Sequence, residues 1–326
     1  MNDTTDGILL IDKDTVDLSS EVVRRVKRIL GARKVGHAGT LDPFASGLLI
    51  ILMGRATALT RFIQAWSKNY RGLILLGSET DTMDPTGRVI RTLPVPRLER
   101  SVIERAAGSF VGEIWQTPPA FSAVRIQGKR AYSLARKGVM PDLSPRKVTI
   151  HSLDIVYCEG PVIDMEVSCS SGTYIRRLAY DLAVSLGTIG HLITLRRTVC
   201  GPFRAYGSIR SSDLKGPLVR DELRERIMPI ADALPDMPAI EIDAALARSL
   251  RVGRKPSIEE LTRQSEKGHP AEGFLRLLNR GDLTAIVRIG SAEDIKSVSL
   301  ERVFPSPDNI NFLKVNPRLC RGTRKV

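Results

Sequence analysis

The chain of 326 residues is long enough for one large domain with a small one, or for two domains of ordinary size. Lys and Arg number 49 against 36 Asp and Glu, which gives a net charge of +13, and the hydrophobic content of 42% excludes a disordered chain. The longest fully apolar run, residues 48–53, is too short to span a membrane. The first residues contain aspartates where a signal peptide carries cations, so we expect a cytoplasmic protein.

Short apolar runs and amphipathic segments alternate along the first two thirds of the chain, without the strict order of a doubly wound sheet. This mixture predicts an α+β fold with a mixed sheet and flanking helices. The first helix is predicted to end at Gly31, because glycine readily adopts the left-handed conformation that closes a helix. Strands are predicted over residues 7–12, 48–53, 70–76, 89–93, 149–157 and 162–168, and helices up to residue 30, over 56–65, 98–110 and 174–186, and in the basic segment before 138.

The composition changes after residue 234, where Pro235 and Pro238 indicate a domain boundary. Short strand patterns follow, the clearest over residues 284–289 and 297–303, separated by glycines and charged turns. We therefore predict a first domain over residues 1–237, with a basic insertion at about 124–150. A small β-rich module with a basic tail is predicted over residues 238–326.

The usual cofactor signatures are missing from the sequence. The four cysteines and four histidines show neither CxxC nor HxxxH spacing, and there is no GxGxxG, GxxxxGK[ST] or GxSxG motif. We therefore expect chemistry that needs no metal and no nucleotide cofactor.

The positive charge is gathered in three runs that contain no acid, at residues 24–34, 125–137 and 314–325. A single run of this kind is typical of a solvated helix face. Three runs favour a polyanionic partner, because clustered cations gain free energy by releasing counterions from a phosphate backbone. Nucleic acid is the expected partner, and an acidic membrane surface is a weaker alternative.

Residues 36–47 (GHAGTLDPFASG) form a predicted loop of small residues that holds one imidazole, His37, and one carboxylate, Asp42. Its glycines allow tight turns and the close approach of a base or phosphate. The pair Asp42-Pro43 alone has a structural explanation, with Asp42 as the N-cap of a helix and proline at its first position.

The whole loop resembles the signature of the TruB-type tRNA pseudouridine synthases, and further motifs of that family follow in order. The similarity covers about residues 7–203, and the module after residue 238 resembles the PUA-type RNA-binding domains attached to such enzymes, with a weaker signal. The further motifs are residues 68–70 (KNY), 76–87 (LGSETDTMDPTG), 116–138 (QTPPAFSAVRIQGKRAYSLARKG), 169–176 (CSSGTYIR) and 195–198 (LRRT).

The resemblance implies three catalytic residues. Asp42 matches the essential aspartate, as expected for a reaction that breaks a glycosidic bond and needs a carboxylate beside the sugar or base. Arg176 matches the arginine that pairs with this aspartate and keeps it ionised. Tyr70 matches the ring that stacks on the target uracil, although an ordinary strand aromatic is the alternative for this residue taken alone.

Further residues are implied to bind the substrate. A uridine inside a folded RNA must leave its stack to react, and His37 matches the residue that fills the space it leaves. Tyr174 and Leu195 match positions that line the uracil pocket. Asp84 matches an acid near the active site, with a turn-forming aspartate before Pro85 as the alternative.

The basic insertion matches a segment of the family that closes over the RNA, which implies phosphate contacts from Arg125, Lys129 and Arg130. Lys13 is also expected to contact RNA. The loop after it departs from the family pattern, however, because Val16 stands where a glycine is usual and a β-branched residue disfavours positive φ. The shape of this loop is therefore expected to differ.

Three functions remain open at this stage. The first is a stand-alone, monomeric enzyme that converts the T-loop uridine of tRNA (position 55) to pseudouridine without an obligatory protein partner. The second is a guide-RNA-dependent enzyme like the related Cbf5/dyskerin proteins, which have a shorter segment where this chain has residues 127–138. The third is a catalytically idle RNA-binding or tRNA-folding protein.

Overall fold

The computed structural model describes residues 5–122, 124–126, 129–132, 142–215, 219–266, 268–292 and 295–306, with the backbone alone at 125–126, 129–130, 292 and 295–296. Contacts divide the chain into two compact units, of which the first comprises residues 1–5 and 9–227 and the second residues 6–8 and 228–326. Within the described ranges, no helix combines the length and apolar character that crossing a membrane requires.

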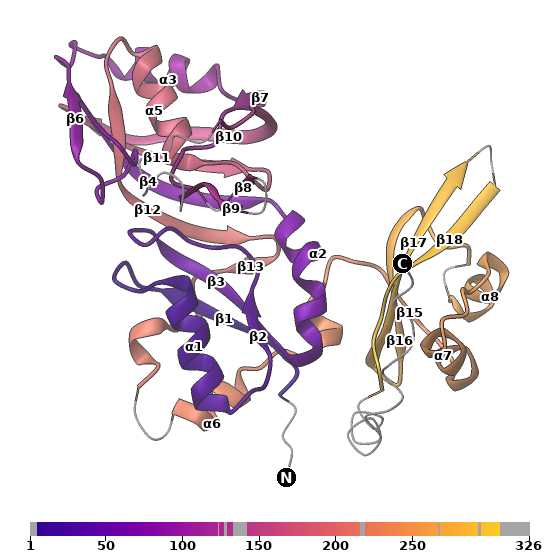
Figure 1. Cartoon of the computed structure of the whole chain (residues 1–326). Helices are drawn as coiled ribbons and strands as arrows, with labels where there is room; N and C mark the ends of the chain where they lie inside the picture. The colour runs from indigo at the N-terminus through magenta and orange to yellow at the C-terminus, as the bar shows by residue number, and fades with distance from the viewer. Residues whose placement is uncertain are drawn as a thin grey trace. The chain divides into compact units, whose positions relative to one another are not determined.

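A ten-stranded mixed sheet organises the first unit (Figure 1). Its main path runs β14-β1-β3-β12-β4-β11-β10-β7, while β2 pairs with β3 and β13 with β12. The β1–β14 and β3–β12 pairs are parallel, and the pairs from β12 to β7 are antiparallel. The strands are β1 Gly7–Lys13, β2 Val35–His37, β3 Ser46–Met53, β4 Lys68–Leu76, β7 Gly112–Gln116, β10 Arg146–Glu159, β11 Val162–Cys169, β12 Gly190–Cys200, β13 Phe203–Arg204 and β14 Ile209–Arg210.

Helices pack on this sheet at several points. Helix α5 packs against β12, α3 against β10, and α1 against β2 and α6. The helices are α1 Ser19–Leu30, α2 Thr60–Ala65, α3 Arg100–Gly108, α5 Ile175–Ser185 and α6 Val219–Glu225, with short 3-10 helices η1 Gly54–Leu59 and η2 Ser211–Asp213. Two small hairpins lie outside the sheet, β5 Ser78–Thr80 with β6 Val89–Thr92, and β8 Arg125–Ile126 with β9 Lys129–Arg130.

The α+β prediction is confirmed, and helix α1 closes at Gly31 in the left-handed conformation as expected. Two differences concern the type of element. The helix predicted over residues 56–65 consists of a 3-10 helix followed by a short α-helix. In the basic segment, strands at residues 125–126 and 129–130 precede a helical stretch that is described at residues 131–132, and residues 133–141 lie outside the described residues.

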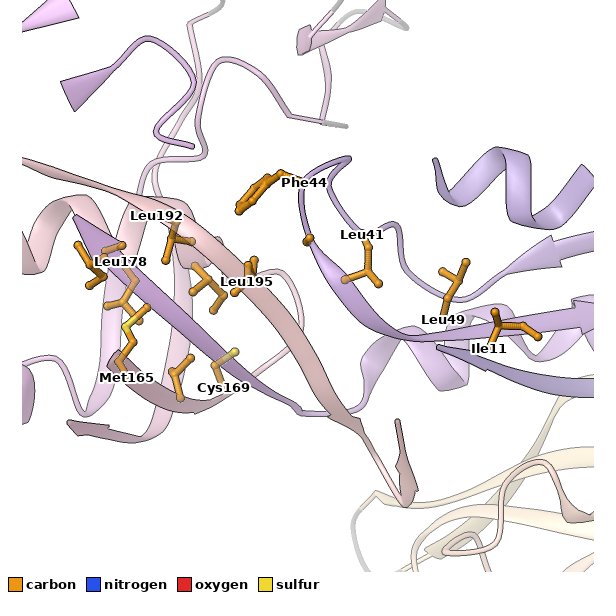
Figure 2. Close-up of a cluster of buried hydrophobic side chains, with 14 of the residues drawn as sticks. Ile11, Leu41, Phe44, Leu49, Met165, Cys169, Leu178, Leu192 and Leu195 are labelled. Carbon is orange, nitrogen blue, oxygen red and sulfur yellow. The ribbon is translucent and has the colours of Figure 1, made fainter. Parts of the chain in front are cut away.

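The sheet consists of two halves that meet between β3 and β12. This parallel contact pairs only Ser46 with Arg196 and Gly47 with Arg197, whereas β12 and β4 pair along almost their whole length. One continuous hydrophobic core lies under both halves. Figure 2 shows its side chains, with Ile11 and Leu49 in one half and Met165, Cys169 and Leu192 in the other.

The second unit has its own sheet and core. Its four strands, in the order β15-β16-β17-β18, are β15 Ala239–Glu241, β16 Gly273–Asn279, β17 Asp282–Ala292 and β18 Ile295–Val303. Helices α7 Ala244–Arg251 and α8 Ile258–Gln264 contribute Leu246, Leu250 and Leu261 to a buried cluster with residues of these strands. The predicted small β-rich module is therefore present, and it also contains helices that the strand pattern does not predict.

Candidate active site

The loop between β2 and β3 holds Asp42 between two anchored neighbours. Leu41 and Phe44 are buried in the core on either side of it (Figure 2). The hydroxyl of Ser19 both accepts a hydrogen bond from the Leu41 N–H and donates one to its carbonyl, each at 3.1 Å. The Ala45 N–H donates to the Asp42 carbonyl, and residues 43–44 form a turn, so the helix N-cap interpretation of Asp42 is wrong.

Arg176, in the first turn of α5, connects two carboxylates. Its side chain is only 3% exposed, and its Nε lies 2.9 Å from an oxygen of Asp42. Its Nη1 lies 3.1 Å from an oxygen of Asp84. The same guanidinium donates to the carbonyls of Thr82 at 2.8 Å and Phe121 at 2.9 Å. These contacts fix the plane of the guanidinium, and with it the direction in which Asp42 is held.

Asp84 is both a turn residue and a member of this cluster. One of its carboxylate oxygens accepts hydrogen bonds from the Thr82 hydroxyl at 2.7 Å and from the Thr86 N–H at 2.9 Å, which is the pattern of an Asx turn. The other oxygen faces Arg176, and the side chain is buried. Asp84 therefore forms a turn, and it also lies beside the arginine that contacts Asp42. We call Asp42, Asp84 and Arg176 the carboxylate–guanidinium cluster.

Burial and the neighbouring charges act on Asp42 in opposite directions. Burial raises the pKa of Asp42 above the usual range of an aspartate, Arg176 opposes the rise, and Asp84 adds to it. About a third of the Asp42 side chain is nevertheless exposed (35%), whereas Arg176 and Asp84 are almost completely buried. A substrate can therefore reach Asp42, while the other two groups act from behind it.

A second buried arginine, Arg197, connects this loop to Tyr70. Arg197 on β12 is the cross-strand partner of Tyr70 on β4 and is only 2% exposed. Its guanidinium donates to the carbonyls of Leu48 at 2.7 Å and Gly39 at 3.1 Å. Burial raises the pKa of Tyr70, so its hydroxyl stays protonated at neutral pH. In the sequence, Arg197 appears only as part of the motif at residues 195–198, and no role of its own was predicted for it.

The other predicted substrate residues lie in different surroundings. Leu195 is buried in the core, and Tyr174 directly precedes α5, with the Arg146 guanidinium 4.8 Å from its ring centroid. His37 ends β2, where burial and the nearby charge of Arg197 lower its pKa, so the ring is neutral at pH 7. Tyr174 is thus adjacent in the chain to the helix that carries Arg176.

Lys13 differs from our expectation of an RNA contact. Its side chain is completely buried, and its ammonium donates to the carbonyls of Asp14 at 2.9 Å, Asp17 at 2.7 Å and Pro43 at 3.4 Å. Burial lowers the pKa of Lys13 to about 8. In this arrangement the side chain ties the first loop to the turn after Asp42 and is not available to a phosphate.

The remaining predicted positions are described only in part. Val16 is 87% exposed and does not adopt positive φ, so the backbone of this loop avoids the strain that a β-branched residue would otherwise meet there. Arg125 and Lys129–Arg130 belong to the β8–β9 hairpin, and their side chains lie outside the described residues.

Comparison with known proteins gives matches over most of the chain. Residues 27–175 match the family described as TruB family pseudouridylate synthase (N terminal domain), and residues 176–235 match the tRNA pseudouridylate synthase B C-terminal domain. The tRNA pseudouridine synthase B of Syntrophus aciditrophicus is 40% identical over 90% of this chain and 94% of its own length. That of Geobacter sulfurreducens is 35% identical over 92% and 99%, respectively.

Among solved structures, a crystal structure of a Cbf5-Nop10-Gar1 complex contains a similar chain, with a TM-score of 0.71 and 25% identity over 93% of this chain and 86% of that one. The family matches cover more than half of the sequence, and they include Asp42, Tyr70 and Asp84 in the first domain and Arg176 at the start of the second. The chain therefore belongs to the TruB family of pseudouridylate synthases.

Proposed function

We propose that this protein is a tRNA pseudouridine synthase that isomerises the T-loop uridine at position 55. The observation that carries the proposal is the carboxylate–guanidinium cluster, in which a partly exposed carboxylate is fixed by a buried arginine in a member of the TruB family. The relatives named tRNA pseudouridine synthase B support tRNA as the substrate.

The reaction breaks the N1–C1′ bond of the uridine, turns the base, joins C5 to C1′, releases the C5 proton and adds a proton to N1. One proton is lost at C5 and one is gained at N1, with water as the medium of exchange, so the product is an isomer and no oxidant or second substrate is required. A carboxylate can attack C1′ or take a proton from the sugar, and both routes require an anion with a fixed direction. Arg176 favours the anion and fixes its direction, because the guanidinium is itself held by three other oxygen acceptors, on Thr82, Asp84 and Phe121.

We assign the base-binding roles to the residues around this carboxylate. We expect Tyr70 to stack on the flipped uracil. Burial keeps its hydroxyl protonated, and the cross-strand pairing with Arg197 fixes its position in the sheet. Tyr174 and Leu195 are to line the pocket, and His37 is to fill the space left in the RNA stack. A neutral imidazole suits such a role, because it can stack and hydrogen-bond without a charge to desolvate.

The RNA is to be held mainly through its phosphates. On α1, Arg24, Lys27 and Arg28 are exposed, Arg24 with Glu21 as an exposed ion-pair partner at 3.5 Å, whereas Arg25 is half-buried in an ion pair with Asp17. The domain division at about residue 237, the PUA-like role of the second domain, and a monomeric state in the cytoplasm without an obligatory protein partner remain our predictions.

A guide-RNA-dependent enzyme is the second candidate, because a solved structure with a similar fold is a Cbf5 complex. It shares the chemistry and differs in what presents the uridine. Activity of the purified chain on tRNA alone therefore discriminates between the two.

The test is tritium release from a tRNA transcript that carries [5-³H]uridine, because C5 loses its hydrogen when it becomes the glycosidic carbon. We expect release by the wild-type protein without added metal, nucleotide or guide RNA. Asp42→Asn should lower the rate by a factor of about 10³ or more while the affinity for tRNA and the melting temperature are retained. Asp154→Asn, at an exposed position on the same sheet, is the matched control and should react at the wild-type rate.

Absence of release from the wild-type protein, with tight tRNA binding, would overturn the stand-alone enzyme in favour of the guide-dependent or idle alternatives. Release by Asp42→Asn at the wild-type rate would overturn the role of Asp42 and leave the activity intact.

A further inference from the structure

The two sheet residues that flank residues 117–145, a range that includes most of the basic insertion, lie side by side at the edge of the sheet. Gln116, the last residue of β7, pairs directly with Arg146, the first residue of β10. The chain between them leaves the sheet and returns to the same point.

Both residues contact Tyr174. The side-chain amide of Gln116 donates from Nε2 to the Tyr174 carbonyl at 3.1 Å and accepts from the Tyr174 N–H at Oε1 at 2.7 Å. Arg146 places its guanidinium 4.8 Å from the centroid of the Tyr174 ring and donates to the carbonyl of Gly172 at 2.9 Å. Gln116 is 1% exposed, so both hydrogen bonds are shielded from water.

These contacts fix the start of helix α5. The Tyr174 carbonyl also accepts from the Leu178 N–H in the first turn, so Tyr174 sets the position from which the helix begins. Arg176 follows two residues later, and its guanidinium also donates to the carbonyl of Phe121, which lies on the first part of the chain that leaves Gln116. Gln116 thus contacts the start of α5, and Phe121, five residues later, contacts Arg176 itself.

We propose that Gln116 is a positioning residue for the reaction, and that it acts by holding Tyr174 and, through the start of α5, Arg176. This inference rests on the proposed function. Gln116 forms hydrogen bonds with both the N–H and the carbonyl of Tyr174. Without this side chain, the start of α5 is expected to be free to rotate. A displacement of about 1 Å at reacting groups costs up to about 10²-fold in rate.

Gln116→Glu provides a test with a distinctive pH dependence. A protonated carboxyl keeps one donor and one acceptor toward Tyr174, as the amide does, whereas a carboxylate faces the Tyr174 carbonyl without a proton. The ratio of the variant rate to the wild-type rate should be near one at low pH and fall by a factor of about 10 or more as the introduced carboxyl ionises. Any effect of Asp42 protonation on the rate is common to both proteins and cancels in this ratio.

The measurement is the single-turnover rate of tritium release from the [5-³H]uridine tRNA transcript, at temperatures well below the melting point of each protein. Gln116→Leu should lower this rate by a factor of about 10 to 10² at every pH, with the tRNA dissociation constant unchanged. Glu113→Gln, which removes an exposed ion pair with Lys147 in the same strand pair, is the control and should match the wild type.

A pH-independent rate ratio for Gln116→Glu, with a melting temperature that does vary with pH, would show a merely structural residue and overturn the inference. A rate for Gln116→Leu within about twofold of the wild type would do the same. If Gln116→Leu fails to fold, the ratio for Gln116→Glu alone decides. Absence of release from the wild-type protein would instead count against the proposed function.

Discussion

Three buried cations surround the Asp42 loop, and their partners differ. Arg176 is paired with two carboxylates, whereas Lys13 and Arg197 donate to backbone carbonyls. Carbonyl oxygens carry only partial charges, so they compensate a buried cation less completely than a carboxylate does. Lysine can respond by releasing its proton, which arginine does not do at physiological pH. Lys13 is therefore the residue at which this difference becomes measurable.

We predict that Lys13 makes the stability of the protein depend on pH in the alkaline range. The pKa of Lys13 is lowered from 10.5 to about 8 in the folded protein, so between these values the unfolded chain binds more protons than the native one. The free energy of unfolding of the wild type should then rise relative to that of Lys13→Met by roughly 2 to 3 kcal/mol between about pH 7 and pH 10.

Urea unfolding of the two proteins at several pH values measures this difference, and other titrating groups cancel between them. Lys34→Met, at an exposed lysine, is the control and should show no such trend. A difference between wild type and Lys13→Met that stays constant over this range would contradict the lowered pKa.

Among the elements, the junction of β3 and β12 depends on a glycine. Gly47 has φ of 101°, and a Cβ atom at this position would lie 2.2 Å from the carbonyl oxygen of Arg197. The neighbouring strand can approach at this point only because Gly47 has no side chain.

A pair of Gly→Ala substitutions tests this with opposite signs. Gly47→Ala should lower the stability by about 3 kcal/mol or more, because it combines a strained φ with a backbone clash. Gly108→Ala, at the end of α3, meets no atom within 4 Å and should raise the stability by about 0.5 to 1 kcal/mol. Thermal unfolding measures the stability of both variants. Equal effects of the two substitutions would contradict the close approach of Gly47 to the Arg197 carbonyl.

Strand β12 and helix α8 show two reasons why elements escape prediction. Strand β12 lies in the middle of the sheet, but its buried Arg197 interrupts the apolar pattern by which a central strand is recognised. Helix α8 does carry a local signal, because Ser257 and Glu260 form a capping box. That signal is present in the sequence, but the strand patterns that follow it are stronger.

At the scale of the whole molecule, the excess positive charge predicts the way in which tRNA binding responds to salt. The logarithm of the association constant should fall linearly with the logarithm of the salt concentration. Replacing the exposed Arg24, Lys27 and Arg28 together by Gln should reduce the slope by about 1 for each phosphate that the variant no longer neutralises. Filter binding or fluorescence titration over a range of salt concentrations measures the slope.

The control for this experiment is Arg210→Gln, because Arg210 is equally exposed but lies on β14, outside the three basic runs of the sequence. Its slope should equal that of the wild type. An unchanged slope in the triple variant would mean that the α1 face does not contact phosphate.

The site as a whole shows what motifs predict and what only the fold supplies. Asp42 and Arg176 are predicted from motifs, and their predicted pairing is present at 2.9 Å. The link from Arg176 to Asp84 and the contact of Gln116 with Tyr174 join residues 92 and 58 positions apart in the chain. No local pattern encodes such pairs, because they depend on how the strands and α5 pack. The roles assigned to these residues remain predictions.

The junction of β3 and β12 also has a consequence for the order of synthesis. Asp42 leaves the ribosome long before Arg197, and the half-sheet that carries it gains its link to Tyr70 only when β12 is added. A nascent chain that ends before residue 190 therefore contains the Asp42 loop, Tyr70 and Arg176 but lacks the strand that joins them. Chains interrupted during translation should accordingly be unable to modify RNA, although every catalytic side chain is already present.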